Sequence, residues 1–341
     1  MKNLRVAVVG VGQMGRHHAR VYSQVRGVDL VGVVDVDQRS ADATAALYSC
    51  QGFNTIDPIL DRVDAVSIAT PPATHAEIGT QLMNHGIHCL IEKPLATSED
   101  QCRQLIHAAD KNNVVLLVGH IERFNPAIQK LTTLLSQGQR IYAMDVRRMS
   151  RASARITDVD VIADLMTHDL DIVMTLIDRP ITGIVASGVH TPDSTGGDYV
   201  SALLSFDGGA MATLTASRIT QNKVRELSVT CDLGWIVCNF MTQQLSIYRQ
   251  NPMDGTDLGT TRKPHYDVDL SIERIAVRQA EPLAMELQHF VDAVRGHTPP
   301  LVTGHQALAV LKATQTIRSS AAVGRLEHAW AIDASVSSCR G

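Results

Sequence analysis

Several features are missing from this sequence of 341 residues, and each absence excludes a class of protein. The six cysteines form no CxxC pair and no close cluster with histidine: Cys50, Cys89, Cys102, Cys231, Cys238 and Cys339. We therefore expect scattered reduced thiols in a cytoplasmic protein rather than a disulfide framework. The 14 histidines show no HExxH spacing, so we expect no catalytic metal.

Long apolar runs and blocks of like charge are also absent. No stretch approaches the roughly 18 consecutive apolar residues that a membrane span needs. Lysine and arginine number 31 against 35 aspartate and glutamate, and no basic run exceeds two residues. Neither nucleic acid nor a membrane is therefore an expected partner. Residues 1–11 resemble a short signal peptide but lack a small-x-small cleavage site, which favours a cytoplasmic protein.

The length predicts about two domains. Up to residue 118, short β-branched runs alternate with helical patterns, which is typical of a parallel sheet covered on both faces. The expected strands are 6–9, 30–34, 65–69, 88–91 and 114–118, and the expected helices are 14–25, 40–48, 76–84 and 98–111. We expect an α/β fold in which residues 1–121 form a doubly wound Rossmann domain that binds a dinucleotide.

The pattern changes after residue 121. Helical stretches are expected at 126–135, 158–177, 283–295 and 305–323, and strands at 141–147, 183–189, 199–206, 211–216, 226–230, 235–239 and 245–248. The first of these strands leads into a loop rich in arginine and serine, and the sequence Asp-Gly-Gly at 207–209 predicts a hairpin turn. Residues 122–341 should form an α+β domain for substrate binding and oligomerisation, with an open, mostly antiparallel sheet.

A glycine motif, GxGxxG, spans residues 10–15 between the first expected strand and the first expected helix. Its glycines let the chain turn tightly and approach a pyrophosphate, which the helix N-terminus then attracts. Asp35 ends the next strand 20 residues after Gly15, where a carboxylate binds the adenosine ribose and repels a 2′-phosphate. We therefore expect NAD rather than NADP, although Arg39 nearby can hold a phosphate or stack on adenine.

Two further motifs lie at the carboxyl ends of expected strands, where cofactors bind in such folds. They are ATPPATH at residues 69–75 and EKPL at residues 92–95. With the glycine motif, they make the whole chain resemble the glucose–fructose oxidoreductase / inositol dehydrogenase (Gfo/Idh/MocA) family. The resemblance implies that Lys93 contacts both the nicotinamide ribose and the substrate hydroxyl, and that the Lys93–Pro94 peptide is cis.

A third motif, DLMTH, places Asp164 and His168 one helical turn apart, so both can face one cleft. By itself the pattern is more typical of a polar helix face, which Asp171 continues. The family resemblance implies that both residues lie opposite the nicotinamide and that Lys93 completes the catalytic set. His168 suits the base that takes a hydroxyl proton near neutral pH. The sequence leaves open whether His168 or Lys93 is that base.

Three segments bear on the substrate: GHIERFNPA at residues 119–127, DLMTHDLDI at 164–172 and TASR at 215–218. They resemble the branch of the family that oxidises C3 of UDP-N-acetylglucosamine on the way to 3-amino sugars for lipid A. A UDP-sugar carries a diphosphate, which basic side chains can neutralise. The candidate cations are Arg123, Arg218, Lys223 and Arg225. Taken singly, each is as readily an ordinary surface charge.

Other interpretations stay open. Inositol or a free sugar would need no cationic pocket, whereas a uronic acid would need one more cation near its C6. Some members of the family are NAD-dependent glycosidases that oxidise C3 transiently. A cofactor-bound sensor is a third class, which an intact proton-transfer set argues against. The resemblance also implies a homodimer or homotetramer, and coupling to a PLP aminotransferase that uses the 3-keto product.

The expected site residues fall into three groups. The catalytic group is Lys93, Asp164 and His168. The NAD-binding group is Gly10, Gly12, Gln13, Met14, Gly15, Asp35, Thr70, Pro71, His75, Glu92, Lys93 and His120. The substrate-binding group is Lys93, Arg123, Asn125, Asp164, His168 and Arg218.

Overall fold

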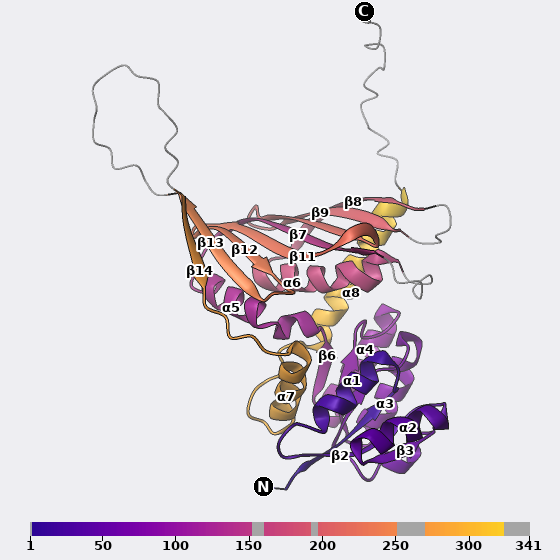
Figure 1. Cartoon of the computed structure of the whole chain (residues 1–341). Helices are drawn as coiled ribbons and strands as arrows, with labels where there is room; N and C mark the ends of the chain where they lie inside the picture. Colours follow the sequence, from indigo (N-terminus) through magenta and orange to yellow (C-terminus); the bar gives the residue numbers. More distant parts are fainter. Residues whose placement is uncertain (1, 152–159, 192–196, 251–269, 324–341) are drawn as a thin grey trace, which may run out of the picture.

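The computed structural model describes residues 2–151, 160–191, 197–250 and 270–323. The chain folds around two sheets that lie one above the other in Figure 1. The N-terminal sheet has six strands and the second has eight. Several helices lie between the two sheets, so residues far apart in sequence meet there.

The N-terminal sheet is parallel, and its strand order β3-β2-β1-β4-β5-β6 is that of the Rossmann fold. Its strands are β1 (Leu4–Val9), β2 (Val28–Val34), β3 (Gln51–Phe53), β4 (Ala65–Ile68), β5 (His88–Glu92) and β6 (Leu116–Gly119). The helices beside it are α1 (Gln13–Tyr22), α2 (Gln38–Tyr48), α3 (His75–Asn84) and α4 (Glu99–Asn112). Short 3-10 turns are η1 (Asp57–Ile59), η2 (Pro72–Thr74) and η3 (Ile121–Phe124). The expected doubly wound domain is therefore confirmed.

The strand order reverses between β1 and β4, and this reversal places the motifs together. Parallel strands end at the same edge of a sheet, and a crevice opens where the order reverses. The glycine motif follows β1, Thr70 follows β4, Lys93 follows β5 and His120 follows β6. Four segments that are distant in sequence therefore meet at one edge.

The second sheet has the order β14-β13-β12-β11-β7-β10-β9-β8. Its strands are β7 (Ile141–Arg151), β8 (Ile181–Val189), β9 (Tyr199–Phe206), β10 (Met211–Ser217), β11 (Ile219–Cys231), β12 (Gly234–Asn239), β13 (Gln244–Gln250) and β14 (Leu270–Ile275). Only the β7–β10 pairing is parallel among these described strands, so the expected mostly antiparallel sheet is confirmed. In β9, every second side chain from Val200 to Phe206 is buried, as in a strand covered on one face.

Helices cover one face of this sheet (Figure 1). They are α5 (Pro126–Leu135), the π-helical turn η4 (Ile162–Met166), α6 (Thr167–Ile177) and α8 (Gly304–Val323). The remaining helix, α7 (Pro282–Val294), instead buries Leu287 and Phe290 in the core of the N-terminal sheet. Along α8, Leu308 joins that first core while Ile317 joins the second. The division of the chain at residues 121 and 122 stays a prediction.

Some elements differ from the expectation. The edge strands β3 and β14 were not predicted, because β3 is three residues long and β14 is mostly exposed, so neither carries a strong apolar signal. The strand β7 runs on to Arg151 where a loop was expected, and residues 152–155 of that loop lie outside the described residues. The hairpin at 207–209 is confirmed, since it joins the antiparallel pair β9 and β10. Within the described ranges, no helix has the length and apolarity to cross a membrane.

Candidate active site

The glycine loop has the shape that a dinucleotide needs. Gly10 has a φ of +86°, which a residue with a side chain rarely adopts. A Cβ on Gly15 would clash with the carbonyl oxygen of Gly10, only 1.7 Å away. A glycine at this position therefore lets α1 pack closely against the loop. A Cβ on Gly12 would meet nothing within 4 Å, which leaves open space where a pyrophosphate can approach. The loop therefore fits the expected NAD, with the exposed Gln13 beginning the helix.

Asp35 lies beside this loop at the end of β2. Its Oδ2 accepts a hydrogen bond from the Val11 N–H at 2.8 Å, and its Oδ1 accepts one from the Asp37 N–H at 3.0 Å. These bonds fix the carboxylate but leave lone pairs that ribose hydroxyls can use. Arg39, in the first turn of α2, is exposed.

The loops after β4 and β5 are tied together by His75. The ring is fully buried, with Nδ1 lying 3.0 Å from the Pro94 carbonyl oxygen and Nε2 lying 2.9 Å from the Thr70 carbonyl oxygen. The Lys93–Pro94 peptide is cis, as the resemblance implied. Pro71 is exposed and Thr70 is half-buried, so these two can face a ligand, whereas His75 holds the loops in place.

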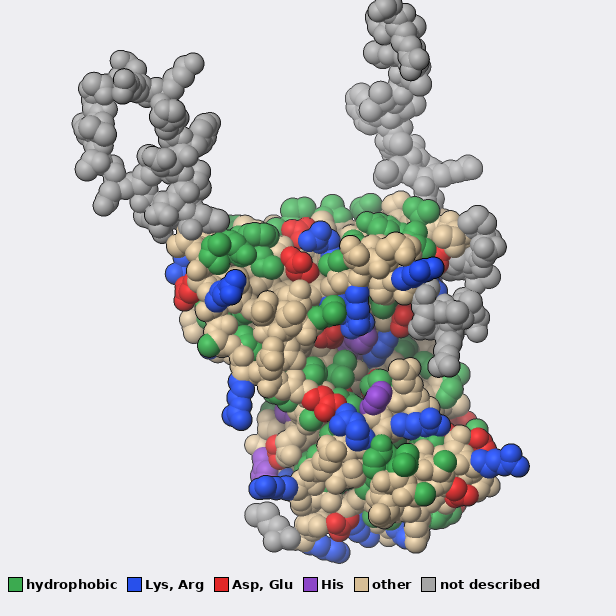
Figure 2. All heavy atoms as spheres, in the orientation of Figure 1, with side chains coloured by type: hydrophobic (Ala, Val, Ile, Leu, Met, Phe, Trp, Pro, Cys, Tyr) green, Lys and Arg blue, Asp and Glu red, His purple; other side chains and the backbone are tan. Residues whose placement is uncertain are grey.

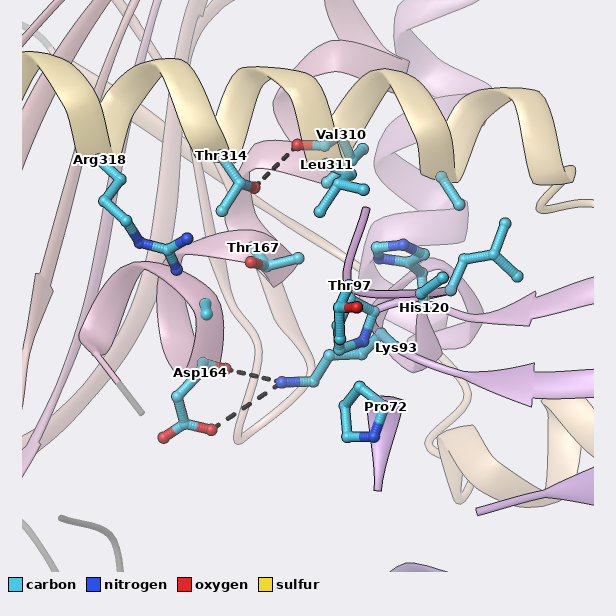
Figure 3. A pocket seen from close by; sticks show the side chains of 15 residues that line it. Pro72, Lys93, Thr97, His120, Asp164, Thr167, Val310, Leu311, Thr314 and Arg318 are labelled. Carbon is cyan, nitrogen blue, oxygen red and sulfur yellow. Dashed lines mark hydrogen bonds and ion pairs between the residues drawn. The ribbon is translucent and has the colours of Figure 1, made fainter. Parts of the chain in front are cut away.

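Lys93 projects from the end of β5 across to the second domain (Figure 3). Its Nζ donates a hydrogen bond to the main-chain oxygen of Asp164 at 2.9 Å and lies 3.9 Å from Asp164 Oδ1. Both residues line a cavity of about 360 Å³ between the two parts of the molecule. Figure 2 shows the molecule hollowed at this level, with basic and histidine side chains at the hollow.

The electrostatics around Lys93 bear on proton transfer, and they include His168, which is buried close to Lys93 but is not among the residues that line the cavity. Burial lowers the pKa of Lys93, while Asp164 and Glu92 oppose that shift. Burial, followed by the positive charge of Lys93, holds the pKa of His168 well below its usual value. A neutral His168 can accept a proton, and a Lys93 ammonium with a lowered pKa releases its proton more readily than usual. The Nδ1 of His168 is buried with no hydrogen-bond partner among the described residues.

Asp164 and His168 do not belong to one regular α-helix. Asp164 lies in η4, where residues 162–166 are π-helical, and His168 lies in the first turn of α6. The Thr167 hydroxyl donates to the Ile162 carbonyl oxygen five residues back, which fits the wider turn. The assumption of plain α-helical spacing was therefore wrong. Local π turns of this kind are frequent at functional sites.

The segment after β6 is used differently from the expectation. Arg123 is 6% exposed, and its Nε and Nη2 donate to the two Asp171 oxygens at 2.7 and 2.6 Å. Asn125 is buried, caps α5 by accepting the Ala127 N–H, and donates to the Phe240 carbonyl oxygen. Neither residue lines the cavity. Their side chains are occupied, so direct contact with a substrate diphosphate is not what this geometry supports.

The other expected cations do not line the cavity either, although Arg225 is close enough to Lys93 and His168 for its charge to lower their pKa values. Arg218 Nε lies 3.4 Å from Asp198 Oδ1, and Arg225 Nη1 lies 3.9 Å from Glu122 Oε1. Lys223 is exposed on β11. His120, expected to bind the cofactor, does line the cavity and is almost completely buried.

Sequence reasoning missed Arg148, a buried cation whose charge acts on His168. This fully buried arginine donates from Nε to Asp169 Oδ1 at 2.8 Å and from Nη1 to Glu122 Oε1 at 2.9 Å. Its charge is one of the causes that lower the pKa of His168. The alternation of the strand was the signal that could have found it, because Arg148 follows Met144 and Val146 on the buried face at a spacing of two residues.

The cavity wall on α8 was also missed. The side chains there are Ala307, Val310, Leu311, Thr314 and Arg318. They share one helical face, but nothing in their spacing indicates that this face meets residues more than 200 positions earlier. Arg318 is bound by Asp160, with its Nε 2.6 Å from Asp160 Oδ2. Together with Lys93 and His120, it supplies the basic side chains of the described cavity lining.

The chain matches two family models. Residues 4–120 match a model described as an oxidoreductase family with an NAD-binding Rossmann fold, and residues 139–237 match the GFO/IDH/MocA C-terminal domain. The C-terminal match begins near β7 and ends within β12.

Individual relatives agree with these matches over most of the chain. A UDP-N-acetylglucosamine 3-dehydrogenase from Acidithiobacillus ferrooxidans is 33% identical over 318 residues, 93% of this chain and 97% of that protein. The solved structure of that organism's enzyme, GnnA, has a TM-score of 0.85 at 30% identity and covers 95% of this chain and 99% of its own.

Two further relatives are an inositol dehydrogenase and a protein of gentamicin A biosynthesis. An inositol 2-dehydrogenase from Rhizobium meliloti is 26% identical over 337 residues, covering 93% of this chain and 97% of that protein. GenD2 from gentamicin A biosynthesis, solved in complex with NAD, has a TM-score of 0.77 at 25% identity, covering 95% of this chain and 96% of its own.

Proposed function

The chain belongs to the GFO/IDH/MocA family of NAD-binding oxidoreductases, and from this premise we propose that it oxidises a secondary hydroxyl of a sugar nucleotide. The main support for the proposal is the position of Lys93. Its Nζ is hydrogen-bonded to Asp164 in a cavity next to the sheet edge where the glycine loop lies. We assign the catalytic role to Lys93, Asp164 and His168, as the sequence predicted. The sheet edge with its open position at Gly12 is where the cofactor binds.

When bound, NAD supplies a hydride acceptor for the carbon that bears the hydroxyl. The chain's own residues must then take the hydroxyl proton. His168 is neutral because burial and the charge of Lys93 disfavour its protonation, so it can act as the acceptor. Lys93 donates a hydrogen bond to the reacting oxygen or relays its proton. Asp164 holds the Lys93 ammonium through its main-chain oxygen and its carboxylate.

For the substrate, we propose C3 of UDP-N-acetylglucosamine, because the relative of that activity is 33% identical over nearly the full length of both chains. None of the cations that the sequence nominated lines the cavity, whereas Arg318 does, so Arg318 is the better candidate for the diphosphate. An incoming phosphate would have to compete with Asp160 for that guanidinium. Binding energy from the uridine diphosphate would hold C3 in place, so the free sugar should lose rate as well as affinity.

The test is a coupled assay with purified protein, NAD, UDP-N-acetylglucosamine, a PLP aminotransferase and an amino donor. The equilibrium of the oxidation favours the alcohol, so the aminotransferase draws the reaction forward by consuming the 3-keto product. We expect a 3-amino UDP-sugar, identified by mass and by NMR at C3, and little product from free N-acetylglucosamine. Absence of that product, with brisk reduction of NAD by another compound in a panel of UDP-sugars, sugars and inositols, would reassign the substrate.

Inositol is the second candidate, and one observation favours it. The ion pair between Arg123 and Asp171 removes the cation that a diphosphate would most obviously have used. Inositol needs no such cation, and an inositol 2-dehydrogenase matches 93% of the chain. Replacing Arg318 with glutamine separates the two: the KM for a UDP-sugar should rise strongly, whereas turnover of inositol should not depend on this charge.

A further inference from the structure

A carboxyl group that has no hydrogen-bond partner among the described residues is buried near Glu92, the residue before Lys93. Glu286 lies on the face of α7 that also carries Leu283, Leu287 and Phe290, all of which are buried in the first core. Glu286 is 0% exposed, and neither of its oxygens has a hydrogen-bond partner among the described residues. A charged carboxylate in such surroundings is costly, so this group needs either a proton or a neighbour of opposite charge.

The neighbours of Glu286 come from α1 and β5. His18 Nε2 lies 3.0 Å from Glu92 Oε1, and the ligand atoms of His18, Glu92 and Glu286 all lie within 4.8 Å of one another. Tyr22, also on α1, faces the same group and donates to or accepts from Ser67 Oγ at 2.8 Å. The described surroundings of Glu286 therefore contain a second carboxylate, one imidazole and one phenol, but no lysine or arginine among the groups that shift its titration.

Two carboxylates this close, shielded from water, cannot both be ionised without strong repulsion. Burial, followed by the charge of Glu92, raises the pKa of Glu286 well above its ordinary value. Glu92 has the imidazole of His18 and a main-chain N–H to stabilise its negative charge, whereas Glu286 has neither. The geometry therefore places the proton on Glu286 and the charge on Glu92.

Glu92 connects this cluster to the site. Its Oε2 accepts the Lys93 N–H at 3.2 Å, and its charge is one of the two that raise the pKa of Lys93. The side chain fits because β6 has a glycine at this point: a Cβ on Gly119 would lie 3.0 Å from Glu92 Oε2. The charged and titratable groups that face Lys93 are Glu92, His120, Arg148, Asp164, His168 and Arg225.

We propose that Glu286 and Glu92 hold a single proton between them, carried by Glu286, so that one negative charge, on Glu92 next to His18, lies beside Lys93 and increases its affinity for a proton. Glu286 is then a positioning residue that acts through Glu92 and does not touch the substrate. The proposal goes beyond the proposed function, because it concerns the ionisation of Lys93 whatever alcohol is oxidised.

The first test needs neither substrate nor activity. Infrared spectra of the full-length protein at neutral pH should contain the C=O stretching band of a buried carboxylic acid, which shifts in D2O and disappears in Glu286→Gln. Asp169→Asn is the matched control, because Asp169 is another fully buried acid but is paired with Arg148. Its substitution should leave the Glu286 band in place. A wild-type spectrum without any such band would overturn the proposal even if the variants failed to fold.

The second test is a pH profile of kcat/KM with the substrate identified above, and this arm alone rests on the proposed function. Glu92→Gln removes a negative charge, so the limb governed by Lys93 should move to lower pH by on the order of 1 unit. Glu286→Gln replaces a neutral acid with a neutral amide, so that limb should stay at its wild-type position. Equal shifts in both variants would show that Glu286 is ionised and would contradict the proposal.

The third test asks whether a metal ion occupies the cluster instead. The protein as purified, and after dialysis against zinc chloride, is analysed for bound metal, with His18→Asn as the comparison. We expect no equivalent of metal that depends on His18. One equivalent of zinc that His18→Asn abolishes would replace the shared proton with a metal site and refute our proposal.

Discussion

At the scale of single residues, we expect Asp35 to decide which cofactor is used. Its carboxylate is fixed by two main-chain N–H groups beside the glycine loop, so a 2′-phosphate would meet a negative charge that cannot move away. We expect NAD to bind at least about tenfold more tightly than NADP, a difference of about 1.4 kcal/mol. Titration of the protein with each cofactor measures this ratio.

Asp35→Ser should reduce that preference mainly by weakening NAD, because the ribose hydroxyls lose their acceptor. Arg39→Gln serves as the control, since Arg39 is exposed and makes no bond that orders the glycine loop. Equal affinity of the wild-type protein for both cofactors would show that Arg39 accepts the phosphate after all.

Lys93 and His168 should act on the rate of the reaction more than on binding. We expect Lys93→Met and His168→Ala each to lower kcat by on the order of 10² or more, the usual effect of removing an acid–base group. Cofactor affinity should change little in His168→Ala, because His168 lies in the second domain. Steady-state kinetics and NAD titration measure both quantities. A variant with nearly normal kcat would remove that residue from the catalytic set.

The buried position of His168 also predicts a pH dependence. Because burial and the charge of Lys93 lower its pKa, the ring stays neutral at pH values where a free histidine, with a pKa of about 6.5, is already charged. The acidic limb of kcat/KM should therefore lie below about pH 6.5. A limb above that value, or one that His168→Gln leaves in place, would mean that another group accepts the proton.

At the scale of elements, the pair between Arg123 and Asp171 joins η3 to α6, the helix that begins beside Asp164. Arg123→Ala would leave the buried Asp171 without its partner, at a cost of about 3–5 kcal/mol in the free energy of unfolding. We expect a clear loss of thermal stability with NAD binding retained in the protein that remains folded. Arg225→Ala is the comparison, because Arg225 is more exposed and its closest carboxylate is 3.9 Å away.

Thermal unfolding together with substrate titration distinguishes the two roles of Arg123. If Arg123→Ala melted like the wild-type protein and only raised the KM of a UDP-sugar, the residue would bind substrate, as the sequence suggested, and the structural role would be wrong.

At the scale of the whole molecule, the chain returns to its first core after building its second sheet. Leu287, Phe290 and Val291 of α7 are buried in the core of the N-terminal sheet, so a fragment of residues 1–121 would expose the surface that they cover. Burial of each such side chain contributes about 1.5–3 kcal/mol. We expect the fragment to aggregate or to melt at a much lower temperature than the full chain.

Circular dichroism of the fragment during heating measures this, and a fragment of residues 1–121 extended by a linked copy of residues 282–294 is the control. Cooperative unfolding of the short fragment at the temperature of the intact protein would support the sequence division at residue 121 as a true folding boundary.

The parts of the protein that local patterns determine could be predicted from the sequence. Gly10, Gly12 and Gly15 have to be glycines for backbone and close-contact reasons that act within one loop, and Asp35 follows at a fixed spacing. The alternation of apolar strands with helices is likewise local, since burial on both faces of a parallel sheet requires it. The Rossmann fold and the family of NAD-binding oxidoreductases could therefore be predicted from the residues and the family resemblance, whereas the individual residues that bind NAD stay a prediction.

Only the tertiary structure decided which charges remain free to act. Arg123 and Asp171 lie 48 positions apart, and the fold brings them into one buried pair. Arg318 reaches the cavity from α8, and Glu286 reaches Glu92 from α7. A charge in a sequence looks the same whether it is buried and paired or open to a ligand, because its state depends on neighbours that long-range packing supplies. That is why the sequence determined the NAD-binding Rossmann fold, whereas the pairing of the cations near the cavity required the tertiary structure.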